Sequence, residues 1–298
     1  MDDQWRLLTE PGDREIWFGK ATVIENERIG RDLFRLRLVC PPIARGIVPG
    51  QFVMLRLPNH YDPLLGRAFA LFDVFTDSEH GEAAGLEIVY SSIGKMTKLL
   101  ARWSAGDYLE IWGPLGNGFP PPASSTLLMV AGGIGYTPFM AVGREATGHG
   151  RYGSPPRQAQ PVKRAQLLFG VRTAELLPDD LHRFKDVGVE VQTISDDGST
   201  GHQGLATDLL LKELDKVDPH ETAVYCCGPE ALMKAVADIC VVRGVPCYLS
   251  LETPMACGLG LCYSCVVRVR DDPVSEEWDY HRACIEGPVF DARRIVFE

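Results

Sequence analysis

The chain has 298 residues, of which 45% are apolar and 23% are charged, and its formal net charge is −10. At roughly 150 residues per domain this length predicts about two domains, and the composition excludes a disordered chain, which would be poor in apolar residues. The acidic balance argues against a nucleic-acid partner, because such proteins carry a basic footprint. We expect no membrane association, since no apolar run approaches the roughly 18 residues needed to span a bilayer. We also expect a cytoplasmic location, because the acidic start MDDQWRLLTEPGDRE lacks the apolar core of a secretory signal.

Residues 15–122 predict an antiparallel β-barrel. Short segments rich in β-branched and aromatic residues, such as WFGKATVIENERIG, DLFRLRLVCPP and GLEIVYSSIG, are separated by Gly and Pro at short, regular spacing. This pattern is typical of an antiparallel barrel or sandwich.

Residues 123–246 predict a doubly wound parallel α/β domain. Predicted strands and helices alternate along this region, which is the pattern of a parallel sheet covered on both faces. The predicted strands are 126–133, 164–172, 189–195 and 222–228, and the predicted helices are 138–147, 174–187, 204–214 and 229–244. The intervening GHGRYGSPPRQAQP, residues 148–161, predicts an exposed and mobile loop because of its Gly and Pro content.

Residues 247–298 form a segment too short for a large core of its own, and four of the nine cysteines crowd into its last 42 residues, 257–298. The spacing Cys257-x4-Cys262-x2-Cys265, followed after 18 residues by Cys284, is the plant-type spacing for a [2Fe–2S] cluster. Gly258 and Gly260 would let the loop curl so that backbone N–H groups approach the sulfurs. Structural zinc is the alternative, but its sites usually pair two short CxxC knuckles and only one such pair occurs. Disulfides are disfavoured by the odd cysteine count and the expected compartment.

A glycine-rich turn, residues 132–138, directly follows the first predicted strand of the α/β domain. Glycines at such a turn allow close approach of a pyrophosphate, although tight packing also demands glycine. We expect Thr137 to cap the next helix and Pro138 to occupy its first turn.

Two further segments end strands at the same carboxyl edge, where open α/β sheets bind ligands. Cys227 is either a small packing residue or a group that faces the nicotinamide. Asp196 is either part of a solvated turn or an acceptor for ribose hydroxyls that favours NAD over NADP. The residues predicted to bind NAD are Gly132, Gly133, Gly135, Thr137, Pro138, Asp196, Cys227, Gly228 and Pro229.

In this order, the motifs resemble the ferredoxin–NADP reductase superfamily, over nearly the whole chain. The segments SLETPMACGLGLCYSCVVRV, ACIEGPVF and SDDGSTGHQG are similar to one branch, the electron-transfer subunits of dihydroorotate dehydrogenase B. The resemblance implies a flavin-binding barrel, a nicotinamide-binding α/β domain and a small [2Fe–2S] segment, in that order. Residues 113–119 match the turn between the two main domains, and we interpret most of them as a plain connection.

The resemblance also implies where FAD binds. The family's Arg-x-x-Ser motif corresponds to residues 67–70, so that Arg67 would meet the FAD phosphates and the backbone of Phe69 and Ala70 would line the isoalloxazine. Two residues depart from the family pattern: Ala70 lacks a hydroxyl, and Met96 stands where glycine is common and would crowd the phosphate loop. The residues implied to bind FAD are Arg67, Ala68, Phe69, Ala70, Val89, Tyr90, Ser91, Met96 and Thr97.

The function implied by the resemblance is electron transfer without a catalytic acid or base in this chain. Electrons would pass from dihydroorotate, on an FMN-containing catalytic subunit, through the cluster and FAD to NAD+, in a heterotetramer that serves pyrimidine biosynthesis. Related reductase subunits of a hydrogenase, a sulfite reductase or a ferredoxin–NAD(P) transhydrogenase are alternatives. A zinc-stabilised, nucleotide-binding regulatory module is the alternative from a different class.

Overall fold

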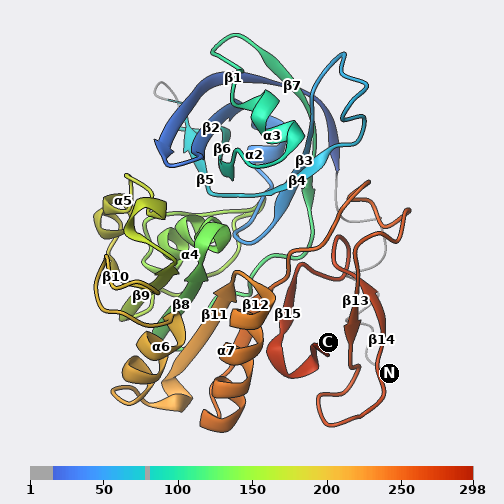
Figure 1. Ribbon diagram of the computed structural model, residues 1–298. Coiled ribbons are helices and arrows are strands. Elements are labelled where there is room, and N and C mark those ends of the chain that lie inside the picture. The colour runs from blue at the N-terminus through green and yellow to red at the C-terminus, as the bar shows by residue number, and fades with distance from the viewer. Residues whose placement is uncertain (1–15, 78–80, 298) are drawn as a thin grey trace.

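The structure is a computed structural model that describes residues 16–77 and 81–297. It has three parts: a barrel, an α/β domain below it, and a C-terminal segment that returns beside both (Figure 1). This confirms the predicted fold class. The acidic start that predicts the lack of a signal, and residues 15 and 298 at the ends of the predicted domains, lie outside the described residues.

The barrel is an antiparallel sheet with the strand order β4-β3-β7-β1-β2-β6-β5 in the described part of the chain. Inward positions carry large apolar residues, so that Leu36 and Leu38 on β2 and Leu86 and Ile88 on β6 are fully buried. The strands are β1 (Trp17–Gly30), β2 (Leu33–Val39), β3 (Phe52–Arg56), β4 (Arg67–Ala70), β5 (Asp73–Thr76), β6 (Ala83–Ser91) and β7 (Tyr108–Leu115). Short helices α2 (Pro41–Ala44) and α3 (Lys95–Leu100) lie between strands of the barrel.

The α/β domain is built on a second sheet with the order β10-β9-β8-β11-β12-β15. All neighbouring pairs in it are parallel except β12 with β15. Its strands are β8 (Thr126–Gly132), β9 (Arg164–Val171), β10 (Val189–Ser195), β11 (Thr222–Cys227), β12 (Cys247–Ser250) and β15 (Val289–Asp291). Its helices include α4 (Phe139–Ala146), α6 (Ala206–Leu214) and α7 (Glu230–Arg243). Because β12 and β15 come from residues 247–298, the C-terminal segment supplies two strands of this sheet.

The remainder of the C-terminal segment is a two-stranded hairpin and a short 3-10 turn. The hairpin pairs β13 (Val266–Val269) with β14 (Asp279–Arg282), and the turn is η5 (Ala292–Arg294).

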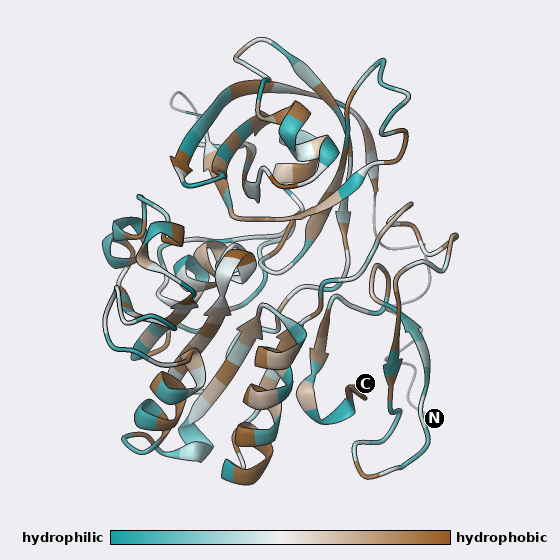
Figure 2. Ribbon diagram, viewed as in Figure 1, coloured by the Kyte–Doolittle hydropathy of each residue, from teal (hydrophilic) through white to brown (hydrophobic). Residues whose placement is uncertain are grey.

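Brown, apolar residues concentrate on the strands and inner helix faces, and teal residues on loops (Figure 2). No helix of the described ranges is long and apolar enough to cross a membrane.

Two local predictions in the α/β domain are wrong. The helix expected over 174–187 is a 3-10 turn, η3 (Ala174–Leu176), followed by a short helix α5 (His182–Asp186). Pro178 explains the break, since proline pushes the residue before it to extended dihedrals, and Leu177 has ψ 140°. Thr137 is not a helix cap, because the 3-10 turn η2 (Gly133–Tyr136) gives it helical dihedrals and α4 starts without a side-chain cap.

The loop at 148–161 is anchored, contrary to the mobile loop expected from its composition. Tyr152 is 4% exposed, and its hydroxyl donates to Asp73 at 2.7 Å. Arg157 pairs with the buried Glu145 and donates to the carbonyl of Phe119 at 2.6 Å. The loop therefore fills the joint between barrel and α/β domain.

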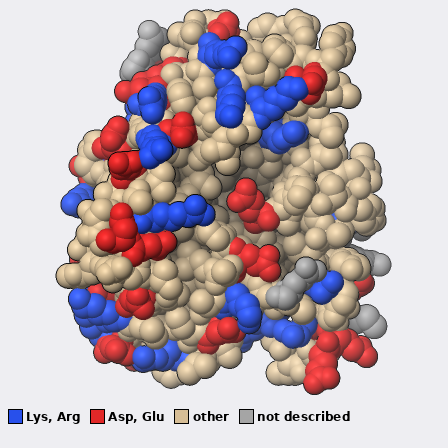
Figure 3. All heavy atoms as spheres, viewed as in Figure 1, with Lys and Arg blue, Asp and Glu red and all other residues tan. Residues whose placement is uncertain are grey.

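Ion pairs reinforce the same joint. Arg144 on α4 pairs with Asp73 at 2.7 Å, and Arg183 on α5 pairs with Glu87 at 2.6 Å. Both carboxylates are buried, so the two domains are held in a defined orientation. Elsewhere on the face drawn in Figure 3, acidic and basic side chains are interspersed around a central hollow.

Candidate functional site: a cavity beside a four-cysteine loop

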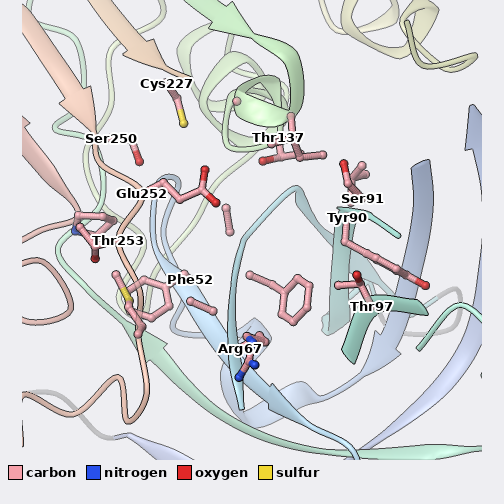
Figure 4. A pocket seen from close by; sticks show the side chains of 18 of the residues that line it. Phe52, Arg67, Tyr90, Ser91, Thr97, Thr137, Cys227, Ser250, Glu252 and Thr253 are labelled. Carbon is pink, nitrogen blue, oxygen red and sulfur yellow. The ribbon is translucent and has the colours of Figure 1, made fainter. Parts of the chain in front are cut away.

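A cavity of about 740 Å³ lies where the barrel, the α/β domain and the C-terminal segment meet. This volume is in the range of small-molecule and cofactor sites. Figure 4 shows labelled side chains from all three parts facing the same space. Each part supplies one wall.

The barrel wall contains all of the residues implied to bind FAD. Arg67 is exposed, and its guanidinium donates to the carbonyls of Leu65 and Gly66 at 3.1 and 2.9 Å. Phe69 and Val89 make the wall apolar. The residues of this wall that were predicted are Arg67, Ala68, Phe69, Ala70, Val89, Tyr90, Ser91, Met96 and Thr97.

Two of these side chains are directed into the barrel core. Tyr90 is 2% exposed, its ring stacks on Phe34, and its hydroxyl donates to Asn26 at 3.0 Å. Burial raises the pKa of the Tyr90 hydroxyl far above its usual range. Met96 is 3% exposed and packs within the barrel core, so most of its bulk is accommodated there.

The α/β wall is formed by the glycine-rich turn and the loop after β11. Gly135, Thr137 and Cys227 line the cavity. The tight packing that was one interpretation of the glycines is found: a Cβ on Gly135 would lie 2.2 Å from the Cys227 carbonyl oxygen, and one on Gly132 would lie 2.7 Å from Leu232. Gly133 differs, because it has φ +54° and open space around it.

Cys227 lines the cavity and also packs against the hydrophobic core. It is half-buried, and it pairs in register with Ser250 of β12. Burial raises the pKa of its thiol to about 12, with a further contribution from the nearby Glu252 carboxylate. The thiol is therefore neutral at physiological pH.

Some predicted NAD residues lie outside the cavity wall. Asp196 is exposed at the end of β10, the edge strand of the sheet, and its carbonyl accepts from Gln203 at 3.2 Å. The others flank residues of the wall without lining it: Gly132, Gly133, Pro138, Gly228 and Pro229.

The third wall is the C-terminal segment, which was not predicted. Glu252 directs its carboxylate into the cavity beside Ser250 and Cys227 (Figure 4). A signal existed, since Glu252 follows strand β12 at the carboxyl edge of the sheet, where ligands bind. No local signal marked the distant contributors Gly50, Phe52 and Pro288. The full set of missed lining residues is Gly50, Phe52, Ile93, Gly94, Lys95, Ile134, Ser250, Leu251, Glu252, Thr253, Pro254, Met255 and Pro288.

The wall leads directly into the four-cysteine loop, two residues beyond Met255. Gly258 and Gly260 have φ values of +71° and +75°, so the loop curls through positions that favour glycine. The backbone N–H of Leu259 donates to the Cys257 sulfur at 3.3 Å. The curl and the N–H···S contact are those expected from the sequence.

The thiols stand as two pairs. Cys262 is hydrogen-bonded to Cys257, and Cys284 is hydrogen-bonded to Cys265. Within residues 16–77 and 81–297, no group of three Cys, His, Asp or Glu side chains is placed to hold one metal ion. Two pairs of thiols fit a centre of two irons, each with two thiolates, better than a single tetrahedral zinc.

The two pairs differ in environment. Cys265 and Cys284 are each 1% exposed, and burial followed by the Cys265 contact raises the pKa of Cys284 to about 12. Cys262 is exposed, and hydrogen bonds from the Ser264 hydroxyl and backbone, then from Cys257, lower its pKa to about 6. One pair is therefore inside the segment and the other is at its surface. All nine cysteines are free.

Comparison with protein families matches each part of the chain. Residues 252–296 match the iron-sulfur cluster binding domain of dihydroorotate dehydrogenase B. Residues 129–238 match the oxidoreductase NAD-binding domain, and residues 20–119 match the oxidoreductase FAD-binding domain. The chain is thus an oxidoreductase component with FAD, NAD and iron–sulfur sites, and the zinc alternative loses its support.

Comparison with whole proteins gives the same result. The chain is 31% identical over 281 residues to the dihydroorotate dehydrogenase B (NAD(+)) electron transfer subunit of Caldanaerobacter subterraneus subsp. tengcongensis, covering 94% of this chain and 99% of the relative. It is 34% identical to the subunit of the same name from Bacillus caldolyticus, covering 93% and 98%. A solved structure of an NADH-dependent reduced ferredoxin–NADP oxidoreductase is similar at a TM-score of 0.74 and 25% identity, covering 93% of this chain and 89% of that one. The chain belongs to the family of dihydroorotate dehydrogenase B electron transfer subunits.

Proposed function

We propose that this chain couples the oxidation of dihydroorotate, on an FMN-containing partner subunit, to the reduction of NAD+. The observation that supports this most is the shared cavity. Its walls are the barrel's flavin motif, the turn of the NAD-binding domain, and the segment that continues into the cysteine loop. Such an arrangement brings a nicotinamide, a flavin and an iron–sulfur centre into one region.

FAD supplies the needed conversion, since it exchanges hydride with a nicotinamide and single electrons with a [2Fe–2S] cluster. The task of the chain is then binding and orientation. Arg67 offers a planar cation for the FAD phosphates, and Phe69 and Val89 offer an apolar wall for its ring. Gly135 and Gly228 let two loops approach each other at the nicotinamide side. Each turnover removes two electrons and two protons from dihydroorotate; NADH carries away both electrons and one proton, and the other proton is released to solvent.

The exposed Cys262 supports a partner at the cluster loop. Leu261 is 78% exposed and Tyr263 is 62% exposed, and they flank Cys262. Exposed apolar side chains around a redox centre fit a surface that a partner subunit covers. We propose a heterotetramer of two such chains and two catalytic subunits, located in the cytoplasm, where the nine free thiols would remain reduced.

We also assign NAD rather than NADP as the nicotinamide. The carboxylate of Asp196 at the end of β10 would repel the extra phosphate of NADP. We propose that the residues predicted from the sequence to bind NAD do so at this edge of the sheet.

The test is reconstitution from purified components. The isolated chain should bind FAD and iron and reduce a dye with NADH, yet leave dihydroorotate untouched. Adding the catalytic subunit should give dihydroorotate-dependent NADH formation. Turnover of dihydroorotate by the isolated chain, or no activity with the catalytic subunit, would refute the proposal.

A second candidate is the equivalent subunit of a ferredoxin–NAD(P) transhydrogenase. It is favoured by the similarity to the NADH-dependent reduced ferredoxin–NADP oxidoreductase over 93% of this chain. Identification of the partner that copurifies with the native chain separates the two candidates.

A further inference from the structure

Strand β7 provides a direct link between the barrel and the iron–sulfur segment. Trp112, in the middle of this strand, is 9% exposed, and its indole Nε1 donates to the main-chain carbonyl of Cys257 at 2.8 Å. Cys257 is the first of the four cysteines of the loop. The bond therefore ties the backbone of a cluster ligand to the barrel that carries the flavin motif.

The same indole also touches the flavin side of the barrel. Trp112 pairs with Met54 of β3, and a Cβ on Gly66 would lie 2.7 Å from the Trp112 ring. The ring thus packs on the backbone immediately before Arg67. Ala68 and Met255, which both line the cavity, pack against the apolar cluster that contains Trp112. Trp112 lies between the cavity wall and the cysteine loop.

The turn after β7 holds the returning arm of the segment. The Asn117 side-chain amide donates to the carbonyls of Glu286 and Val289 at 3.1 and 2.7 Å, and its oxygen accepts from the Val289 N–H at 3.1 Å. The Asn117 backbone N–H donates to the Gly287 carbonyl at 2.7 Å. These partners follow Cys284 closely, so the arm is fixed just beyond the last cysteine.

The contact between the end of β7 and the iron–sulfur segment is closely packed. A Cβ on Gly116 would lie 2.5 Å from Pro288, and one on Gly258 would lie 2.8 Å from both Leu115 and Met54. Both glycines also have positive φ, at +75° and +71°. The segment can therefore sit this close to β7 only because glycine occupies both positions.

We propose that Trp112 and Asn117 are positioning residues that fix the iron–sulfur segment against the flavin barrel, with Trp112 orienting Cys257. This inference deepens the proposed function and rests on it. Groups beyond the ligands orient a metal site, and their loss typically costs roughly 10- to 100-fold in affinity or activity. The step they serve moves one electron, so that in the proposed direction the cluster loses one and the flavin gains one, and with NADH as donor the same step runs in reverse. No bond is made or broken at either residue. The turn at 113–119 is thus more than the plain connection expected from the sequence.

The first experiment uses Trp112→Phe, which keeps an aromatic ring and removes the indole N–H. The full chain, loaded with FAD and iron, is mixed with NADH without oxygen, so that two electrons enter the flavin as hydride. We expect the flavin to bleach at the wild-type rate. The rate of cluster reduction, normalised to the amount of cluster in the sample, should fall roughly 10-fold. The electron paramagnetic resonance (EPR) spectrum of the cluster should also change. Trp103→Phe is the matched control, because its indole donates to the Tyr108 carbonyl at 3.2 Å within the barrel. It should behave as wild type.

The second variant, Asn117→Asp, keeps the acceptor for the Val289 N–H and removes both amide donors. It should lower iron retention or slow reduction of the remaining cluster, and it decides the matter if Trp112→Phe does not fold. Wild-type iron content, EPR spectrum and cluster-reduction rate in the folded variants would overturn the proposal. Failure of the proposed function is separate, because it would appear as absent dihydroorotate oxidation with the partner, whereas this test uses NADH and the chain alone.

Discussion

The cysteine loop and the cavity beside it are built in opposite ways. The loop concentrates its chemistry in four side chains on one short segment, and strand β7 holds that segment from outside. The cavity takes its walls from three parts of the chain, and several of its close contacts exist only because a residue lacks a side chain. The loop should therefore be most sensitive to the loss of its thiols, although Gly258 also tolerates no added side chain, whereas the cavity should be sensitive chiefly to the addition of atoms.

The largest effect should come from Cys265→Ser. Cys265 is 1% exposed and paired with Cys284. The serine variant therefore lacks one thiolate ligand, and water cannot reach the buried position to take its place. We expect loss of most iron and sulfide with FAD retained, measured by metal analysis and the visible spectrum. Cys40→Ala, at another buried cysteine, should keep its iron. Equal iron in the two variants would contradict the assignment of the ligands.

The next effect concerns the one cationic side chain that we assign to FAD. Arg67→Ala should weaken FAD binding by roughly 10- to 100-fold, because a hydrogen bond to a charged group contributes about 1.5–3 kcal/mol. Arg67→Lys keeps the charge without the planar fork and should fall between. FAD affinity measured on the flavin-stripped chain checks this, and iron content should not change. Wild-type affinity in Arg67→Ala would remove Arg67 from the site.

A smaller effect tests the sensitivity of the cavity to added atoms. Gly135→Ala places a methyl group 2.2 Å from the Cys227 carbonyl oxygen, and such overpacking costs about 1–3 kcal/mol. Displacement of the Cys227 loop should also raise the KM for NADH roughly 10-fold. Gly133→Ala is the matched variant, because it has open space and only the strain of φ +54°, about 1 kcal/mol. If both variants have the same KM for NADH, the packing of the two loops is not what shapes the nicotinamide site.

The smallest effect concerns pH. The pKa of Cys227 is raised to about 12, so its thiol stays protonated from about pH 6 to pH 9 and changes no charge there. The pH profile of NADH-dependent dye reduction should have the same shape in wild type and in Cys227→Ala. An inflection present in wild type and absent in the variant would show that this thiol ionises within the working range.

The same contrast explains what the sequence could predict. Cysteine spacing is a local property, so the loop and its glycines were recognisable from residue order. The alternation of strands and helices is also local and was recognisable in the same way. The Arg67 segment carried a weaker signal, and only its resemblance to a family gave it a role. Glu252 was missed although it lies two residues beyond the end of parallel strand β12, and Gly50 and Phe52 reach the cavity through tertiary packing alone. Trp112 and Asn117 were missed for the same reason, since their partners lie 145 and about 170 residues away.

The most direct test of the central claim, that cavity and loop form one electron-transfer unit, is an anaerobic NADH titration of the isolated chain. Flavin absorbance and the low-temperature EPR signal of the cluster are recorded together, with iron and zinc measured on the same sample. We predict bleaching of the flavin accompanied by the signal of a reduced [2Fe–2S] cluster, in a chain that holds iron. A bleached flavin without any cluster signal, or zinc in place of iron, would contradict it.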